Sequence, residues 1–478
     1  MKLRELLEDI TVLNSNIDLN EEVGSICYDS RKCEPGCAFV CIAGFKSDGH
    51  DYVAQALSRG AKVCIVGRAM QGVPHVLVEN TRLALACMSS RWFDNPSTKF
   101  ELIGVTGTNG KTSATYILKS ILEEKGAKVG LIGTNQNMIG EKILETERTT
   151  PESYELQELF AMMVSEGVSY VVMEVSSHSL ALNRVSCCEF DVGIFTNLTR
   201  DHLDFHESME DYYKAKAKLF GMATVGIINY DDEHGKRLLE EAPSKSFSFS
   251  IGSTEADVVA KNVKMSQEGI DCEILFKDRI FRAELGIPGK FSVYNALSAV
   301  TCALVLGIEP EVITGALSKI KGVKGRAEVV PTQGRDFTVI IDYAHTPDGI
   351  YNIISAVRGF AKGRIVALFG CGGDRDAGKR PKMGHMAGSM ADFCIVTSDN
   401  PRSEEPGAII EDILPGVKET GCEYTVIENR EEAIEYALQS AQAGDVILLL
   451  GKGHETYQIL KDSTIHFDER EIVFKYLK

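Results

Sequence analysis

Short apolar runs alternate with helix-like amphipathic segments along most of this chain, and turn-forming residues separate them. Such alternation predicts α/β architecture, with mostly parallel sheets covered by helices. Brief runs at 38–42, 63–66 and 76–78 precede the turn cluster Asp94-Asn95-Pro96-Ser97. The predicted strands that follow lie at 100–105, 129–132, 170–173, 192–195, 225–229, 339–341, 365–369, 393–396 and 446–450.

Two breaks in this pattern divide the chain into three predicted domains. The first break is the turn cluster near residue 97, and the second is a glycine-containing linker at Gly322 and Gly325. A length of 478 residues accommodates about three domains of ordinary size. We therefore predict a small N-terminal α/β domain (1–97), a central parallel-sheet domain (98–325) and a C-terminal Rossmann-like domain (326–478).

Composition narrows the class of protein. Hydrophobic residues make up 44% of the chain and charged residues 25%, as in ordinary globular proteins. The net charge of −17 repels nucleic acid and anionic membranes, so neither is an expected partner. The 13 cysteines are scattered and odd in number, which favours reduced thiols. An acidic N-terminus and the lack of a long apolar run favour a cytoplasmic location.

The residues Gly107-Thr108-Asn109-Gly110-Lys111-Thr112 lie between a predicted strand and a predicted helix. In that context glycines turn backbone N–H groups toward a phosphate, the lysine meets the outer phosphates, and the threonine hydroxyl can hold Mg²⁺. The usual phosphate-loop pattern has a glycine where this chain has Val105. An ordinary tight turn is the alternative interpretation.

Two further strand ends carry candidate metal ligands. Glu174 directly follows the run at 170–173, and a carboxylate there can coordinate Mg²⁺; a solvated strand-end acid is the alternative. The run at 192–195 leads into Thr196-Asn197-Leu198-Thr199-Arg200-Asp201-His202-Leu203-Asp204. His202 in this cluster is a candidate ligand for a second metal ion or a phosphate, whereas a lone histidine is more often structural.

A predicted helix at 208–220 carries Lys214, Lys216 and Lys218. Residues two apart on a helix point in different directions, so the three lysines cannot share one environment. A lysine held neutral in the site can capture CO₂ and become an anionic carbamate ligand for Mg²⁺. The sequence pattern alone also fits a solvated lysine face.

Three residues are candidates for nucleotide contacts. Asn295 opens a predicted helix, where its amide can pair with a base edge or simply cap the helix. Arg326 at the linker can swing onto a phosphate, although a solvated linker arginine is equally open. Asp342, after the run at 339–341, is a candidate partner for a ribose hydroxyl.

Polar clusters follow four predicted strands of the C-terminal block. They are 342–347, 370–376, 399–402 and 451–455. Ligands of open α/β sheets bind beyond the carboxyl ends of the strands, so these clusters predict one binding site. Arg375 offers a bidentate clamp for a carboxylate, Glu455 can pair with an ammonium, and Asp399-Asn400-Pro401-Arg402 suits a ligand with both groups.

Taken together and in order, these motifs resemble the Mur ligases, the ATP-dependent amino-acid ligases of peptidoglycan precursor synthesis. The resemblance runs over essentially the whole chain. It rests on Gly107–Thr112, Glu174-Val175-Ser176-Ser177-His178, Thr196-Asn197-Leu198, Asp201–Asp204, Tyr294-Asn295-Ala296, Asp342-Tyr343-Ala344-His345 and Asp399–Arg402.

The resemblance implies a role for each candidate residue. The first domain would hold UDP near Ser30, and the sugar-peptide would meet Thr149, Thr150, Ser176 and Arg184. Residues Gly107, Thr108, Asn109, Gly110, Lys111, Thr112, Asn295, Arg326 and Asp342 would bind ATP. Thr112, Glu174, His202 and a carbamylated Lys216 would bind Mg²⁺, with Lys111, Glu174, His202 and Lys216 catalytic. The incoming amino acid would meet Arg375, Asp399, Asn400, Pro401, Arg402, Gly451 and Glu455.

The implied activity is ligation of meso-diaminopimelate to UDP-N-acetylmuramoyl-L-alanyl-D-glutamate through an acyl phosphate, by a monomer acting in cell-wall synthesis and hence in cell shape and division. In this family Asp-Asn-Pro-Arg accompanies diaminopimelate, because the arginine meets the distal carboxylate that lysine lacks. Leu182 departs from relatives that carry glutamine there. An L-lysine-adding ligase, a folate-polyglutamating ligase, a phosphotransferase and a nucleotide sensor are the alternatives.

Overall fold

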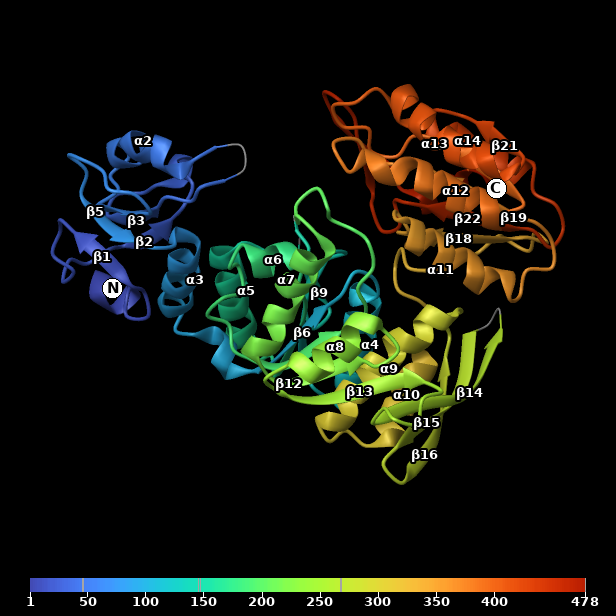
Figure 1. Ribbon diagram of the computed structural model, residues 1–478, viewed down its shortest axis with the longest axis horizontal. Helices are drawn as coiled ribbons and strands as arrows, with labels where there is room; N and C mark the ends of the chain where they lie inside the picture. The colour runs from blue at the N-terminus through green and yellow to red at the C-terminus, as the bar shows by residue number, and fades with distance from the viewer. Residues whose placement is uncertain (45–46, 145, 147, 267–268, 478) are drawn as a thin grey trace. The chain divides into compact units, whose positions relative to one another are not determined.

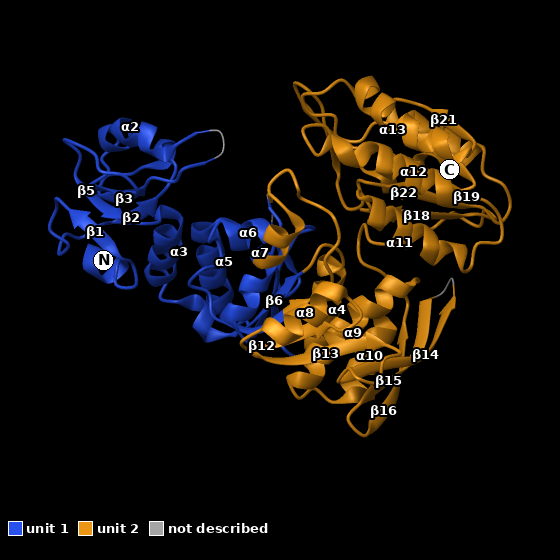
Figure 2. Cartoon of the chain, in the orientation of Figure 1, with its two compact units in different colours: residues 1–106, 127–193, 215–224 blue, residues 107–126, 194–214, 225–478 orange. Residues whose placement is uncertain are grey.

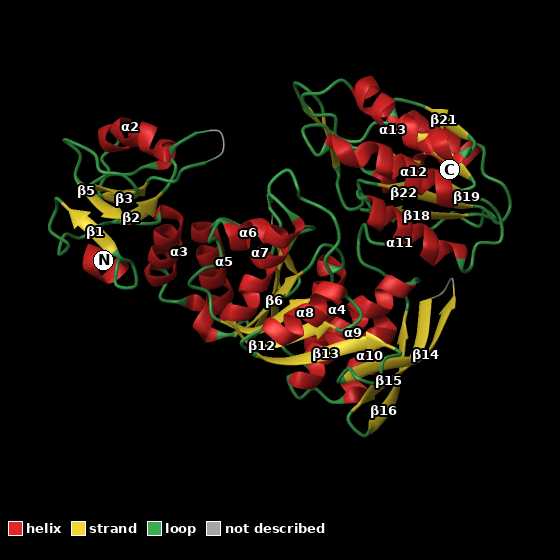
Figure 3. Ribbon diagram, viewed as in Figure 1, coloured by secondary structure: helices red, strands yellow, loops and turns green. Residues whose placement is uncertain are grey.

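The computed structural model describes residues 1–44, 47–144, 146, 148–266 and 269–477 (Figure 1). By its internal contacts the chain divides into two compact units, coloured separately in Figure 2. The first unit contains residues 1–106, 127–193 and 215–224, and the second contains 107–126, 194–214 and 225–478. Figure 3 shows that helices and strands intermix along most of the chain, which confirms the predicted α/β class.

A five-stranded sheet forms near the N-terminus, in the order β1-β5-β4-β3-β2. Its neighbouring strands are parallel except for the β1–β5 pair. Alternate residues of β3 point to opposite faces: Ala38 and Val40 pack in one apolar cluster, and Phe39 packs in the other. The strands and helices are β1 (Val12–Ser15), β2 (Ser25–Cys27), β3 (Cys37–Val40), β4 (Val63–Val66), β5 (His75–Val78), α1 (Leu3–Leu6), α2 (Val53–Ser58) and α3 (Thr81–Trp92).

The largest sheet has eleven strands, in the order β16-β15-β14-β13-β12-β11-β6-β10-β7-β8-β9. β10 runs parallel to both β6 and β7, as the alternation of strands and helices predicts. The strands are β6 (Glu101–Thr106), β7 (Val129–Ile132), β8 (Asn137–Ile139), β9 (Lys142–Leu144), β10 (Tyr170–Glu174), β11 (Phe190–Phe195), β12 (Ala223–Asn229), β13 (Lys245–Ile251), β14 (Val258–Ser266), β15 (Gly269–Phe276) and β16 (Arg279–Leu285).

Antiparallel strands end this sheet on both sides, which the sequence reading did not anticipate. β14, β15 and β16 form a meander, and β8 pairs antiparallel with β7 and β9. The helices of this part of the chain are α4 (Lys111–Glu124), α5 (Ser153–Ser165), α6 (Ser177–Ala181), α7 (Met209–Met222), α8 (Glu233–Glu241), α9 (Lys290–Val305) and α10 (Pro310–Lys319). α4 packs against α9 and α10.

The C-terminal sheet has the order β17-β18-β22-β19-β20-β21, and only β17 is antiparallel to its neighbour. Parallel strands place their carboxyl ends along one edge, so the four polar clusters that follow β18, β19, β20 and β22 share that edge. The strands are β17 (Glu328–Val330), β18 (Thr338–Asp342), β19 (Ile365–Phe369), β20 (Phe393–Val396), β21 (Tyr424–Val426) and β22 (Val446–Leu450).

Helices and a small hairpin complete this part of the chain. They are α11 (Pro347–Arg358), α12 (Arg380–Met390), α13 (Pro406–Thr420), α14 (Arg430–Gln439), α15 (Glu469–Leu477), and the hairpin of β23 (Tyr457–Ile459) and β24 (Thr464–His466). Apolar residues of α14 and α15 share one buried cluster with alternate residues of β18, β19 and β22. This packing fixes the orientation of the strand ends that carry the polar clusters.

One expectation about cysteine is wrong. Cys87 and Cys187 form a disulfide, with Cα atoms 5.3 Å apart and 100 residues between them in sequence. The two half-cystines meet only through tertiary packing, which spacing along the chain does not reveal. Most of the other cysteines are buried in the core as free thiols, as expected. Within the parts of the chain that the structure describes, no helix has the length and apolar character needed to cross a membrane.

Candidate active site

The phosphate-loop candidate lies between β6 and α4, in the predicted strand-loop-helix context. Gly107 and Gly110 adopt φ values of +148° and +88°. A Cβ atom on Gly107 would lie 1.9 Å from Oγ1 of Thr196, and one on Gly110 would lie 2.3 Å from Oδ1 of Asn295. Both glycines are therefore required by backbone conformation and by space. Asn295, predicted to contact the nucleotide, lies against this loop.

The segment after β11 holds the loop from the other side. Thr196 donates from Oγ1 to the carbonyl of Asn109 at 2.6 Å. Oδ1 of Asn197 accepts the N–H of Asn109 at 2.9 Å, and the backbone carbonyl of Asn197 accepts the N–H of Thr108 at 2.9 Å. The polar residues after β11 thus shape the loop, a structural role that the sequence reading did not assign to them.

Lys111 and Thr112 begin α4, beneath this loop. The Lys111 ammonium donates to the carbonyls of Gly107 and Thr108 at 3.0 and 2.9 Å. Thr112 is almost fully buried, and its Oγ1 accepts a hydrogen bond from Nη2 of Arg326 at 3.0 Å. The structure therefore brings Arg326 to the loop, and its contact with a phosphate stays a prediction.

Asp348 is a contact to the loop that sequence reasoning missed. Its Oδ2 accepts from Nδ2 of Asn109 at 2.7 Å and from Oγ1 of Thr199 at 3.3 Å. Burial raises the pKa of the Asp348 carboxyl, while these donors and Asn352 lower it. Asp348 follows Pro347 at the start of α11, where the sequence signals only a helix N-terminus.

Asp342 ends β18 with both carboxylate oxygens in use. They accept the backbone N–H groups of Ala327 at 2.6 Å and Ala344 at 2.8 Å. Burial raises the pKa of Asp342, whereas Arg326 and the two N–H donors lower it. The carboxylate thus fastens the linker to the strand end. Its contact with a ribose hydroxyl stays a prediction.

Two half-buried histidines flank the Tyr343 ring. The ring centroids of His345 and His454 lie 4.7 and 5.1 Å from that of Tyr343, and the Arg326 guanidinium lies 4.6 Å from it. Burial lowers the pKa of His345 to about 4 and that of His454 to about 3. Both imidazoles are therefore neutral at physiological pH, which suits a site that already contains arginine.

His202, the predicted metal or phosphate ligand, has a partly exposed side chain with a backbone φ of +54°. Its Nε2 lies 3.4 Å from Oδ2 of Asp201, and its N–H donates to Oδ1 of that residue at 2.9 Å. Burial raises the pKa of Asp201, but His202, His345 and Lys379 outweigh it and leave the pKa lowered. An ionised carboxylate therefore lies beside His202.

Glu174 closes β10 as a buried residue, which rules out the solvated strand-end alternative. Its two oxygens accept the N–H of Thr134 at 2.8 Å and the hydroxyl of the same residue at 3.0 Å. A Cβ atom on Gly133 would lie 2.5 Å from Oε1, so a glycine makes room for the carboxylate.

The three lysines of α7 differ in burial, as the helix geometry predicts. Lys216 is about 1% exposed, whereas Lys214 and Lys218 face solvent. Lys216 is therefore the lysine of this helix with a buried environment, which supports the choice made from the resemblance. Among the residues whose placement is described, His, Cys, Asp and Glu side chains form no cluster of three suited to a metal ion.

Four predicted sugar-peptide residues come together near the end of β10. Thr150 donates from Oγ1 to the carbonyl of Glu174 at 2.8 Å and accepts the N–H of Ser176 at 3.1 Å. Thr149 shares a hydroxyl contact of 3.0 Å with Thr134, and Arg184 donates to the Thr150 carbonyl at 3.3 Å. Ser30 lies beside the first sheet, where its hydroxyl donates to Oε1 of Gln55 at 2.7 Å.

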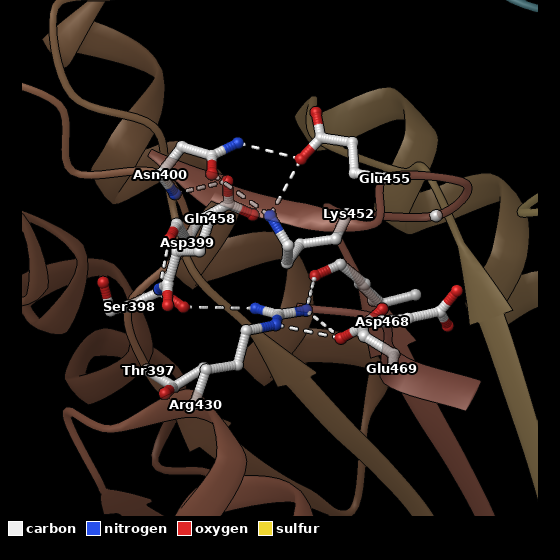
Figure 4. A network of polar contacts seen from close by, with 12 residues as sticks. Thr397, Ser398, Asp399, Asn400, Arg430, Lys452, Glu455, Gln458, Asp468 and Glu469 are labelled. Carbon is white, nitrogen blue, oxygen red and sulfur yellow. Dashed lines mark hydrogen bonds and ion pairs between the residues drawn. The ribbon is translucent and has the colours of Figure 1, made fainter. Parts of the chain in front are cut away.

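The predicted amino-acid site forms a polar network at the C-terminal sheet edge (Figure 4). Asn400 donates from Nδ2 to Oε2 of Glu455 at 2.8 Å. Lys452, fully buried, donates to the same oxygen at 2.8 Å and to Oδ1 of Asn400 at 3.1 Å. Burial raises the pKa of Glu455, and Lys452 lowers it. Sequence reasoning singled out Glu455 but missed Lys452, although the position of Gly451-Lys452-Gly453 directly after a buried strand was an available signal.

A second buried ion pair lies beneath this network. Arg430 and Glu469 are both inaccessible to solvent and 2.8 Å apart. Arg430 also donates to the carbonyls of Leu450 at 2.8 Å and Ser398 at 3.4 Å, so it ties the ends of β22 and β20 together (Figure 4). The pair therefore supports the strand ends on which Asp399 and Gly451 lie.

Arg402 and Arg375 both approach Gly372. A Cβ atom there would lie 2.8 Å from Nη1 of Arg402 and 3.8 Å from Cγ of Arg375. Arg402 adopts a φ of +55° and donates to the carbonyl of Gly373 at 2.9 Å, whereas Arg375 is exposed. The predicted carboxylate clamps therefore lie near one another, next to Pro401 and the Asp399–Asn400 pair.

Comparison with known proteins identifies the family. Residues 22–91 match the model of the Mur ligase family catalytic domain, 105–303 match the Mur ligase middle domain, and 325–453 match the Mur ligase glutamate ligase domain.

Individual relatives match almost end to end. The UDP-N-acetylmuramoyl-L-alanyl-D-glutamate–2,6-diaminopimelate ligase of Caldanaerobacter subterraneus subsp. tengcongensis is 54% identical, over 96% of this chain and 95% of that protein. Ligase 1 of the same name from Clostridium acetobutylicum is 48% identical, over 100% of this chain and 99% of that protein. A solved structure of a ligase of this name superposes with a TM-score of 0.72 and 28% identity, covering 100% of this chain and 98% of that one.

The phosphate loop, the buried Glu174, the polar edge of the C-terminal sheet and these full-length matches lead to one conclusion: the chain belongs to the Mur ligase family.

Proposed function

We propose that this protein is an ATP-dependent ligase that joins meso-2,6-diaminopimelate to UDP-N-acetylmuramoyl-L-alanyl-D-glutamate in peptidoglycan precursor synthesis. The observation that supports this proposal most is the strand-edge network around Asn400. Arg402 donates to its carbonyl at 3.4 Å, its amide donates to Glu455, and its N–H donates to Asp399. An amino acid with two amino and two carboxylate groups needs acidic and basic partners on one rigid surface, and this edge supplies both. Relatives of about half-identical sequence bear the name of this activity.

The ATP-binding residues in this proposal surround the phosphate loop. Lys111 and the backbone N–H groups of 107–112 would hold the phosphates, Arg326 would add a second positive charge, and Asn295 and Asp342 would contact base and ribose. These roles are supported by the contacts of Arg326 with Thr112 and of Asn295 with Gly110.

A magnesium ion fits the chemistry of the available donors. Thr112 offers a hydroxyl and Glu174 a carboxylate, and oxygen ligands are those that Mg²⁺ prefers. His202 and a carbamylated Lys216 complete the proposed ligand set, and Lys216 is the buried lysine of α7. The ion would neutralise charge on the phosphate oxygens.

The proposed reaction proceeds in two steps. The D-glutamyl γ-carboxylate attacks the γ-phosphorus of ATP, the bond to the β,γ-bridging oxygen breaks, and ADP leaves. Lys111 stabilises the charge on the transferred group. The amine of diaminopimelate then attacks the acyl carbon; the tetrahedral intermediate loses phosphate and a proton, leaving an amide. Because water would hydrolyse the acyl phosphate, domain closure about Gly322 and Gly325 precedes chemistry.

Several finer features belong to the same proposal. They are the domain boundaries at 97 and 325, a monomeric state, a cytoplasmic location, independence from membranes and nucleic acid, and a part in cell shape and division. The ranges that match the family models, 22–91, 105–303 and 325–453, support the boundaries.

Among the alternatives, an L-lysine-adding ligase has one specific feature against it. Arg402 donates to Gly373 and adjoins Arg375, so two guanidinium groups are available for carboxylates. Lysine has one carboxylate and diaminopimelate has two. If the protein were a folate-polyglutamating ligase, the N-terminal sheet would have no substrate to bind. If it were a phosphotransferase or a nucleotide sensor, the polar clusters at the C-terminal sheet edge would have no function.

The decisive experiment measures phosphate release from ATP in the presence of the UDP-dipeptide, with diaminopimelate or L-lysine as acceptor. We expect release to depend on diaminopimelate and an amide product whose mass increases accordingly. Faster release with lysine would reassign the acceptor. Release without any acceptor and without an amide would exclude a ligase.

A further inference from the structure

Two cysteines of the C-terminal sheet lie close together as free thiols. Cys394 is the second residue of β20 and is fully buried, whereas Cys422 is half-buried in the segment between α13 and β21. Their Sγ atoms are 3.9 Å apart, although the two residues are 28 positions apart in sequence. A disulfide requires sulfur atoms about 2.05 Å apart, so a movement of about 2 Å closes the remaining gap.

The turn after α13 holds Cys422 against β20. Gly421 ends the helix with a φ of +71°, a left-handed conformation that glycine favours. Oγ1 of Thr420 accepts the N–H of Cys422 at 3.3 Å. On the far side of Cys422, the carbonyl of Glu423 accepts the N–H of Cys394 at 3.0 Å. Backbone contacts on both sides of Cys422 therefore keep the two sulfur atoms near one another.

The two thiols differ in acidity. The hydrogen bond with Cys394 lowers the pKa of the Cys422 thiol, although burial, Asp392 and Glu423 oppose this effect. The same hydrogen bond and burial raise the pKa of Cys394. The thiolate is the form of cysteine that reacts with oxidants, and its reaction requires access from solvent. Cys422, the more acidic and more exposed of the two, is therefore the nucleophile of the pair.

The surroundings of Cys422 select the kind of oxidant. The negative charges of Asp392 and Glu423 act on its sulfur, so they also repel an anionic disulfide such as oxidised glutathione. Half-burial of the side chain restricts its partners to small molecules. A small uncharged hydroperoxide meets both conditions.

We propose that Cys422 and Cys394 form a site of reversible oxidation by hydroperoxide. The Cys422 thiolate attacks one peroxide oxygen, the O–O bond breaks, and hydroxide leaves, so that Cys422 becomes a sulfenic acid. The Cys394 sulfur then attacks the Cys422 sulfur, the S–O bond breaks, and the oxygen leaves as water with the Cys394 proton. The two cysteines lose two electrons to the peroxide and form a disulfide.

The bond has a chemical consequence for Cys422. A sulfenic acid that meets more peroxide is oxidised irreversibly to a sulfinic acid, whereas a disulfide is reduced again by thiols. Cys394 thus protects its neighbour from permanent damage. The site lies outside the residues assigned to ATP, metal and substrates, so it does not depend on the proposed function.

The test is treatment of the reduced full-length protein with hydrogen peroxide, followed by mass spectrometry of its peptides. We expect the peptides of Cys394 and Cys422 to become linked with the loss of two hydrogen atoms, and a thiol reductant to separate them. Oxidised glutathione at the same concentration should form the link about tenfold more slowly or less. Cys27 is the internal control, because it is also a half-buried free thiol, but burial raises its pKa. Iodoacetamide should label Cys422 about fivefold or more faster than Cys27.

Cys394→Ser separates this proposal from simple surface oxidation. Without its partner, Cys422 should gain two oxygen atoms as a sulfinic acid that the reductant does not reverse. If this variant does not fold by circular dichroism, Cys394→Ala replaces it. Sulfinic acid at Cys422 of the wild-type protein without a link to Cys394 would overturn the proposal, as would an unmodified Cys422 at a peroxide concentration that oxidises Cys27. A link that forms faster with oxidised glutathione would overturn the assignment to hydroperoxide.

Discussion

Arg326 donates a hydrogen bond to the hydroxyl of Thr112, although 214 residues separate them in sequence. Thr112 begins the helix after the phosphate loop, and Arg326 lies in the linker that leads to the C-terminal sheet. The contact ties the nucleotide-binding loop to the segment that is expected to move during closure.

Replacing Arg326 should therefore weaken ATP use. For Arg326→Ala we expect the KM for ATP to increase about tenfold or more, because one charged donor near the phosphates is lost. KM values for the UDP-dipeptide and diaminopimelate should change much less. Steady-state kinetics with each substrate varied in turn measure this. Arg335→Ala, in the exposed loop between β17 and β18, is the control; an equal effect there would remove the specific role of Arg326.

Arg402 is expected to decide the choice of amino acid. Arg402→Ala should lower kcat/KM for diaminopimelate by about 100-fold, near the upper value for a charge-assisted bond, and hardly affect ATP or UDP-dipeptide. The readout is kcat/KM for each substrate. Arg358→Ala is the control, since Arg358 makes an exposed ion pair with Asp392 in the same domain. Equal losses on all three substrates would count against this role.

Lys216 provides a test of the carbamate. Lys216→Ala should nearly abolish activity, and a small added carboxylic acid should restore part of it by replacing the missing anionic oxygens. Lys218→Ala, exposed on the same helix, should keep nearly full activity. An experimental density map at Lys216 without the extra atoms of CO₂ would disprove the modification.

The buried pair of Lys452 and Glu455 should be important for stability. Lys452→Met leaves Glu455 and Asn400 without their buried donor, so we expect the free energy of unfolding to fall by about 3–5 kcal/mol. Lys461→Met, which breaks an exposed pair with Glu405, should cost less than about 1 kcal/mol. Urea unfolding measures both. Adding Glu455→Gln to Lys452→Met should recover part of the loss, and no recovery would mean that the pair is not coupled.

Stability should fall in mild acid because of His345 and His454. Their pKa values in the folded protein are about 4 and 3, below the ordinary value of 6.5. Below pH 6.5 the two histidines take up protons in the unfolded chain but stay neutral in the folded chain. Their contribution to stability is therefore full above pH 6.5 and decreases as the pH falls toward 4. Thermal unfolding from pH 7 to 4 measures the slope. Asparagine at both positions should reduce that slope; an unchanged slope would assign the acid sensitivity to other groups.

The buried parallel strands were predictable because they are continuous apolar runs that end in glycine or polar residues. β19 and β22 have the predicted bounds for this reason. The meander of β14 to β16 was missed because its exposed face carries lysine, arginine and glutamate, as in Lys261, Glu273 and Arg282, so no apolar run appears. Half-exposed antiparallel strands give a weaker signal than buried parallel ones.

The site residues also fall into those that the sequence predicts and those that only the structure reveals. Residues at or shortly beyond strand ends, such as Glu174 and Asn400, were found because strand ends are visible in the sequence. Lys452 and the Arg430–Glu469 pair were not assigned, and neither was the Cys87–Cys187 bond. Each of these contacts joins segments that are distant in sequence, and only tertiary packing brings them together.

The ion pair of Arg430 with Glu469 has a consequence for the timing of biosynthesis. Glu469 begins α15, 39 residues after Arg430, so it leaves the ribosome later than the arginine that it neutralises and that ties β20 to β22. Until that residue emerges, the nascent chain has a guanidinium facing the core without its counter-ion, which disfavours closure of the sheet edge. Prematurely terminated chains that stop before residue 469 should therefore be preferred substrates for cellular proteases, even with every proposed ligand-contacting residue already synthesised.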